Sequence, residues 1–154
     1  MAGGPFDKAV ILVLEQNSYN TFGLVLNNPP KQGTYPAGGP VEPDAYYTIH
    51  SLDLSAHNTV QIADMDMGYT KGDTFLLLIR QMGDKPREHI TFRGYTSWPR
   101  GQMLSEIEMG KWRVVDFNAR LVFHTSPAEM WNVGTHLPDA KPDHSTILSR
   151  ILLP

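Results

Sequence analysis

The sequence predicts a single domain of the α+β class, and three observations support this. The chain has 154 residues, of which 41% are hydrophobic, which is about the size of one compact domain. Segments typical of strands and segments with helix end signals follow one another without regular alternation, which favours α+β over repeated βαβ units. No internal repeat or low-complexity linker is present. We place the domain at residues 5–154 and treat residues 1–4 as a short addition ahead of it.

The most apolar segments lie near the N-terminus. The run "KAVILVLEQ" (8–16) is continuous and β-branched, which is typical of a strand buried on both faces. "TFGLVL" (21–26) predicts a second strand that stops before two prolines. The "NSYN" between them has turn chemistry, so the two strands could form a hairpin. Residues 29–43 are rich in Pro and Gly, and we expect a loop there.

Short strands and one helix are expected in the middle of the chain. "AYYTIHSLDL" (45–54) has the β-branched and aromatic content of a strand, and "TVQIADMDMGYT" (59–70) suggests one or two more. Asp73 could cap a helix over "TFLLLIRQM", with Gly83 as its stop. "HITFRGYTS" (89–97) alternates as a strand should.

A tryptophan-rich segment follows. Residues 94–112, "GYTSWPRGQMLSEIEMGKW", hold two of the three tryptophans in the chain. They predict a short helix over about residues 99–109 that begins with Pro99 and is followed by Gly110. Trp98 and Trp112 flank this helix, from where their large rings could hold its ends against a sheet.

Gln102 and Glu106 are the polar exceptions in this segment. Being four residues apart, they share one face of the predicted helix. Such a carboxylate and amide could bind a ligand or act as acid or base. Alternatively, they hydrogen-bond to the backbone of the preceding loop and hold Trp98 in place. We favour this second interpretation, because most side-chain hydrogen bonds go to backbone or water.

Further strands and a helix are expected towards the C-terminus. "KWRVVDF" (111–117) and "ARLVFHT" (119–125) have the appearance of the two arms of a hairpin. Ser126 and Glu129 have the spacing of a capping box for a helix with Pro127 at its first position. The apolar C-terminus is expected to dock as a strand or helical turn.

Composition excludes several classes of function. The net charge of −3 lacks the basic excess that nucleic acid requires, and the helix at 99–109 carries Glu106 and Glu108, so direct DNA binding is not expected. No apolar run approaches the roughly 20 residues that cross a bilayer. We expect a soluble cytoplasmic protein, with an exported form that has lost its signal as the alternative.

No cofactor or metal site is predicted. The absence of cysteine rules out disulfides and zinc–thiolate sites. His50, Asp53 and His57 supply ligand types, but in a strand they do not share one face. There is also no GxSxG motif to nominate a nucleophilic serine.

Several motifs, in order from about Phe6 to Gly134, resemble the YqgE/AlgH family of bacterial proteins, whose function is largely undetermined. The resemblance is carried by "GLVLNNP" (23–29), "GGPV" (38–41), "YYTIHSL" (46–52), the spacing GYxxWxxGQxxxEIxxGxW (94–112), and "LVF" (121–123) followed by Trp131. It implies a compact α+β fold on a mixed, partly barrel-like β-sheet. Members are often labelled transcriptional regulators, but the family offers no established catalytic residues to carry over.

The chain departs from this family pattern in two places. Members usually begin with a further strand before the segment that matches residues 5–16, so we expect the first strand to lack a neighbour. Members also commonly have a basic residue where this chain has Asn28. The resemblance therefore supports no anion-binding role for that turn here.

Our first hypothesis is a non-enzymatic binding or regulatory module that holds a protein segment or small ligand. Loops on rigid scaffolds often carry function, and the resemblance pairs two such loops with the Trp98 segment. Alternatively, Gly38 and Gly39 merely permit a turn. The surface that we predict consists of Asn27, Asn28, Pro29, Gly38, Gly39, Pro40, Trp98, Gln102 and Glu106.

Two other hypotheses stay open. The protein could be an unrecognised enzyme that uses Glu106, perhaps with His50, as acid or base, although we assign no catalytic residue. Alternatively, the marked residues could only maintain the fold, with function in the C-terminal tail. The sequence does not identify the partner or the oligomeric state.

Overall fold

A computed structural model describes residues 8–140 and 147–154 of the chain. Residues 1–4 lie outside this part, so their exclusion from the domain stays a prediction. The strands of the described residues are β1 (Ile11–Gln16), β2 (Asn20–Val25), β3 (Val41–Ser51), β4 (Val60–Gln61), β5 (Met67–Lys71), β6 (His89–Pro99), β7 (Arg113–Val115) and β8 (Ile151–Leu153). The helices there are α1 (Thr74–Met82), α2 (Gln102–Glu108), α3 (Ala119–His124) and α4 (Pro127–Thr135).

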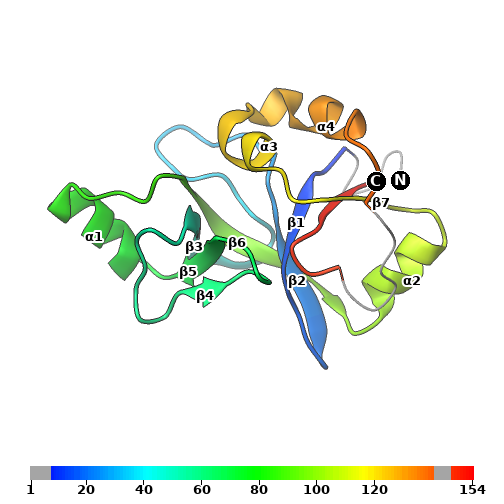
Figure 1. Cartoon of the computed structure of the whole chain (residues 1–154), viewed down its shortest axis with the longest axis horizontal. Coiled ribbons are helices and arrows are strands. Elements are labelled where there is room, and N and C mark those ends of the chain that lie inside the picture. The colour runs from blue at the N-terminus through cyan, green and yellow to red at the C-terminus, as the bar shows by residue number, and fades with distance from the viewer. Residues whose placement is uncertain (1–7, 141–146) are drawn as a thin grey trace.

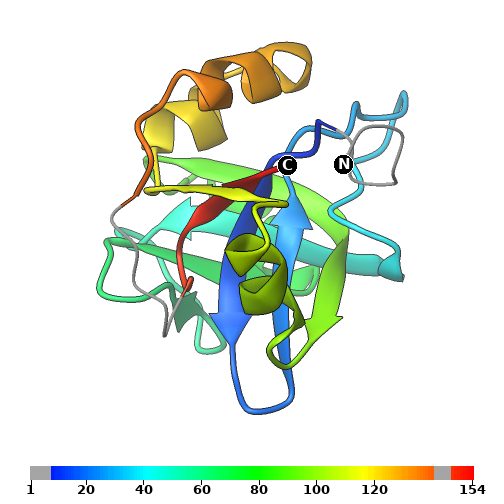
Figure 2. The same cartoon turned by 90° about the vertical axis from the view of Figure 1, so that its right-hand side faces the viewer.

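The strands form one curled sheet in the order β4-β5-β3-β6-β2-β1-β8-β7, with α3 and α4 on one face and α2 on the other (Figures 1 and 2). The α+β class and the partly barrel-like sheet are therefore confirmed. All pairs between these strands are antiparallel, so the expectation of a mixed sheet is wrong. Within the described residues, parallel pairing is confined to the isolated bridge between Ala37 and Arg93.

Strand β1 lies inside the sheet and is buried on both faces, as its sequence predicts. Leu12 and Leu14 point into the core beneath α3 and α4, whereas Ile11 and Val13 point into the core beside α2. The expected hairpin with β2 is confirmed. The expectation that β1 lacks a neighbour is wrong, because β8 pairs with its other edge. The apolar strand β8 thus lies between β1 and β7 in the sheet.

Helix α1 is confirmed, with Gly83 in the left-handed conformation (φ 72°) at its end. Its predicted N-terminal cap is wrong in detail, because the Asp73 side chain makes no capping hydrogen bond. The capping box before α4 is also absent. Pro127 begins that helix as expected, but the backbone oxygen of Ser126, and not its hydroxyl, accepts the Glu129 amide at 3.1 Å.

The predicted hairpin of residues 111–117 and 119–125 is wrong. Residues 119–124 form α3, and β7 pairs with β8 instead. Asn118 decides this locally, because its side chain accepts the Leu121 amide at 2.9 Å and caps the helix. Helix α3 buries Leu121 and Val122, which both belong to the apolar stripe of the helix that faces the core.

The helix predicted at residues 99–109 is shorter at its start. Trp98 and Pro99 belong to β6, where they pair with Thr21 and Asn20 of β2. Gly101 then adopts a φ of 79° and turns the chain into α2. Trp98 pairs with Thr21, which is 77 residues away in sequence. This pairing outweighs the local preference of Pro99 for the first turn of a helix.

Candidate functional site

The tryptophan-rich segment forms a structural brace. Trp98 and Trp112 are only 5% and 4% exposed, and their rings meet edge to face at 6.3 Å. The Glu106 carboxylate accepts the Trp112 indole N–H at 3.1 Å and the Gln102 side-chain amide at 2.9 Å. Glu106 thus fixes a buried ring, and its partners are these side chains rather than the preceding loop backbone that we expected.

Residues 36–41, which we call the glycine strap, lie against the backbone of β6. The Val25 amide donates to the Gly38 oxygen at 2.8 Å, and the Gly38 amide donates to the Arg93 oxygen at 2.7 Å, so the strap fills the space between β2 and β6. A Cβ on Gly94, which has a φ of 73°, would lie 2.5 Å from the Gly39 oxygen. The glycines therefore permit this close approach.

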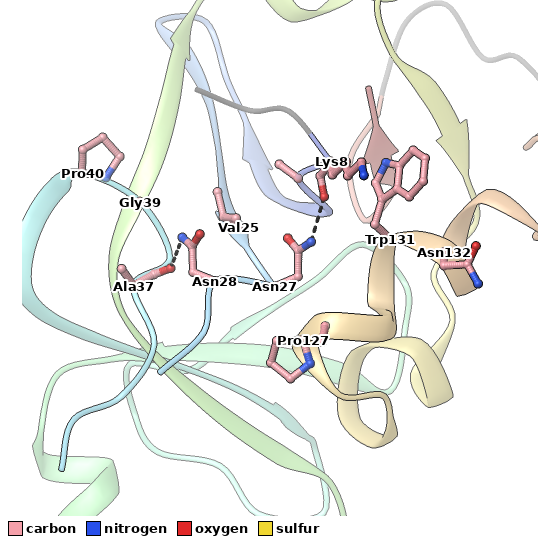
Figure 3. A pocket seen from close by; sticks show the side chains of 12 residues that line it. Lys8, Val25, Asn27, Asn28, Ala37, Gly39, Pro40, Pro127, Trp131 and Asn132 are labelled. Atoms are coloured by element: carbon pink, nitrogen blue, oxygen red, sulfur yellow. Dashed lines mark hydrogen bonds between the residues drawn. The ribbon is translucent and has the colours of Figure 1, made fainter. Parts of the chain in front are cut away.

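Two asparagines anchor the segment that follows β2 (Figure 3). The Asn27 side chain accepts the Val10 amide at 2.9 Å and donates to the Lys8 oxygen at 2.8 Å. The Asn28 side chain donates to the Ala37 oxygen at 2.8 Å. Asn27 thus holds the segment that leads into β1, and the adjacent Asn28 holds the glycine strap. Lys8 itself has a φ of 58°, which is unusual for a residue with a side chain.

An open cavity of about 820 Å³ lies between these segments and α4, and we call it the asparagine cleft. Its volume is within the range of roughly 300–1,000 Å³ that is usual for ligand sites. The cleft unites four residues of the predicted surface: Asn27, Asn28, Gly39 and Pro40. Lys8 and the α4 residues Pro127, Trp131 and Asn132 also line it.

One of the residues that line the cleft, Trp131, has a buried polar atom. The indole Nε1 of Trp131 is buried and has no hydrogen-bond partner among the described residues. The Lys8 ammonium lies 5.5 Å from the centre of the same ring, and Figure 3 shows its side chain reaching the indole. The described residues that line the cleft include no carboxylate. An indole N–H and an ammonium group together favour an anionic hydrogen-bond acceptor.

The structure does not bring the whole predicted surface together. Trp98 packs with Met103 and Trp112 in the core beside α2, and neither Gln102 nor Glu106 lines the asparagine cleft. Pro29 and Gly38 are sequence neighbours of residues that line the cleft, but they do not line it themselves.

His50 and Glu106 also lie apart. His50 is buried against Phe75 of α1, and α1 and α2 lie at opposite ends of the molecule (Figure 1). The His50 nitrogens contact the Thr70 hydroxyl at 2.7 Å and the Ser51 oxygen at 2.9 Å. Burial lowers the pKa of His50, which favours the neutral imidazole. The acid–base pair of our alternative hypothesis is therefore not assembled.

The described residues contain neither a metal-binding cluster nor a membrane-spanning helix. No group of three or more histidine, aspartate or glutamate side chains comes together there in a way that could hold a metal ion. None of the helices in residues 8–140 and 147–154 has the length and apolar character needed to cross a membrane.

Sequence reasoning missed Lys8 and Trp131 as cleft residues. Trp131 follows the Ser-Pro start of a predicted helix, so its place on that helix could have drawn attention to it. Lys8 carries no local signal. Its position depends on the hydrogen bond between its own backbone oxygen and Asn27, which is 19 residues away in sequence.

The chain is similar in sequence to proteins of other organisms. The chain is 29% identical over 140 residues to a UPF0301 protein of Chlorobium limicola, which covers 82% of this chain and 75% of that protein. It is 24% identical over 159 residues to a UPF0301 protein of Hydrogenovibrio crunogenus, covering 90% and 84% of the two chains.

Two solved structures have the same fold. A crystal structure of a Corynebacterium diphtheriae protein matches with a TM-score of 0.71 at 21% identity, covering 95% of this chain and 86% of that one. The solution structure of AlgH from Pseudomonas aeruginosa matches with a TM-score of 0.64 at 18% identity, covering 88% and 90%. The model of the AlgH-like family matches residues 1–137, and the chain therefore belongs to the AlgH-like family.

Proposed function

We propose that this protein is a non-catalytic binding module that holds a protein segment or small molecule in the asparagine cleft. The bound group would be a carboxylate or a similar anionic acceptor. The observation that carries the proposal is the buried indole N–H of Trp131, which has no partner among the described residues. A buried donor without an acceptor costs about 1–3 kcal/mol, and a ligand acceptor would remove this cost.

The charge around the cleft supports the same ligand class. Lys8 contributes a positive charge beside the indole, in a chain whose net charge is −3. Asn28 does not provide that charge, so Lys8 is the cation through which the cleft would hold an anion. The asparagines and the glycine strap hold the cleft walls by backbone contacts, which would keep the cleft formed before a ligand arrives.

A regulatory role would then act through the bound segment. The acidic net charge gives no support to direct DNA contact. Among residues 8–140 and 147–154, no arrangement of acid and base groups around the cleft favours catalysis, because those that line it include neither a carboxylate nor a histidine.

Calorimetric titration with N-acetyl-dialanine tests this proposal, because this peptide presents one free carboxylate on a small apolar body. We expect saturable binding, with the dissociation constant raised about tenfold by Lys8→Gln and by replacing the carboxylate with its amide. Lys31→Gln removes an exposed positive charge that does not line the cleft and should leave binding unchanged. Equal affinity for acid and amide, or no saturable binding, would contradict the proposal.

A further inference from the structure

A second cavity, of about 720 Å³, lies on the other side of the segment that follows β2. Leu26 and Pro30 line this cavity, whereas Asn27 and Asn28 line the asparagine cleft. Pro127, at the start of α4, lines both. The two cavities are thus separated by one short stretch of chain and have different lining residues.

The walls of the second cavity are mostly apolar and come from separate elements. Ile79 of α1, Ile90 of β6 and Met130 of α4 line it together with Leu26. Leu26 and Met130 are each only 1% exposed, so they form its floor. Elements that are far apart in sequence therefore surround one concave apolar space, which is the usual architecture of a small-molecule site.

Positive charge is concentrated at this apolar space. Arg80 and Lys85 both line it, together with His89, and no carboxylate lines it within the part of the chain that the structure describes. Neither Arg80 nor Lys85 forms an ion pair within the described residues. The Arg80 guanidinium donates to the Tyr35 hydroxyl at 2.7 Å, which orients it without neutralising its charge.

From this geometry we propose that the second cavity binds an amphipathic carboxylate, with an apolar chain against Leu26, Ile79, Ile90 and Met130 and its head group at Arg80 and Lys85. Burial of the apolar chain supplies affinity in proportion to the number of methylenes that are removed from water. Two cations that form no ion pair with the described residues select a negative head group over a neutral one. This site is separate from the asparagine cleft and does not depend on it.

Titration of the full chain with decanoate, below its micelle concentration, tests the proposal. We expect saturable binding in this cavity that is tighter than any binding of the decanoate carboxylate in the asparagine cleft. Decanol, which lacks the charge, and butyrate, which lacks six methylenes, should each bind at least about tenfold more weakly. Amide NMR signals of Ile79, Ile90 and Met130 should move at lower decanoate concentrations than those of Asn28 and Gly39 in the asparagine cleft.

A pair of double variants gives the matched control. Arg80→Gln with Lys85→Gln should raise the dissociation constant for decanoate at least about tenfold. Arg100→Gln with Lys111→Gln removes the same charge from exposed residues that do not line the cavity, and should change it by less than about twofold.

Three results would overturn the proposal. These are the absence of saturable decanoate binding, equal affinity for decanoate and decanol, or equal affinity in the two double variants. An acidic amphipathic peptide that binds in place of decanoate would assign the cavity to a protein partner, and would overturn it as well.

Discussion

Two tryptophans in this molecule have opposite hydrogen-bonding environments. In the brace, the buried Trp112 N–H donates to Glu106. In the asparagine cleft, the buried Trp131 N–H has no partner among the described residues. The brace carries the denser sequence motif, yet its polar groups are occupied by one another. We therefore base the proposed binding surface on a buried polar group without a partner among the described residues, rather than on the density of a sequence motif.

The brace should therefore control stability. Trp112→Ala is expected to lower the free energy of unfolding by about 3–5 kcal/mol, because it removes a buried ring and leaves a void beside Trp98. Urea denaturation measures this. Met109→Ala, at a side chain that is 61% exposed, is the control and should cost far less. Equal costs for the two variants would remove the distinction between brace and surface.

The contact between the glycine strap and β6 should be the next most sensitive. Gly94→Ala is expected to cost about 2–3 kcal/mol, because the added Cβ meets the Gly39 oxygen at a positive φ. Gly110→Ala is matched in φ, at 77°, but has nothing within 4 Å of the added Cβ. It should therefore show only the backbone strain of about 1 kcal/mol. Thermal unfolding of both variants would show whether close approach matters beyond conformation.

Variants of Glu106 test whether its carboxylate has a structural or a functional role. Glu106→Ala should cost about 1–2 kcal/mol, because the Trp112 N–H loses its acceptor. Glu106→Gln keeps an acceptor oxygen and should cost less. Both variants should bind N-acetyl-dialanine like the wild type. Loss of that binding in folded Glu106→Gln would show that the brace and the cleft are one site.

The smallest expected effect concerns His50, another buried group whose polar atoms are occupied. Burial lowers its pKa below the ordinary value of 6.5, so the unfolded chain takes up the proton first. Stability should therefore fall as the pH falls below about 6.5. His50→Asn should flatten this part of the stability profile, whereas His57→Asn, at an exposed residue, should not. Identical profiles for the wild type and His50→Asn would contradict this assignment.

Local sequence signals predicted most of the elements but not all of their partners. Patterns within a few residues predict the hairpin of β1 and β2, the α1 helix with Gly83, and the strand at residues 89–97. Residues 119–124 were misassigned because apolar composition alone does not separate a short strand from a short helix, and the Asn118 cap decides between them.

The candidate site was predictable only in part, for a related reason. The asparagine and double-glycine motifs identified two walls of the cleft, because turn chemistry is local. The placement of Trp98 in a separate core depends on the pairing of β6 with β2, and the arrival of Lys8 depends on a contact with Asn27. Such long-range pairings have no signature in a short stretch of sequence.

The central claim is that the cleft recognises a carboxylate through the Trp131 N–H, which has no partner among the described residues. In the ¹⁵N-labelled protein, the three tryptophans give three indole N–H signals that can be followed during titration with N-acetyl-dialanine. The account predicts a saturable downfield shift of the Trp131 signal, with the Trp98 and Trp112 signals unmoved. A Trp131 signal that stays in place while binding occurs, or a shift confined to Trp112, would contradict it.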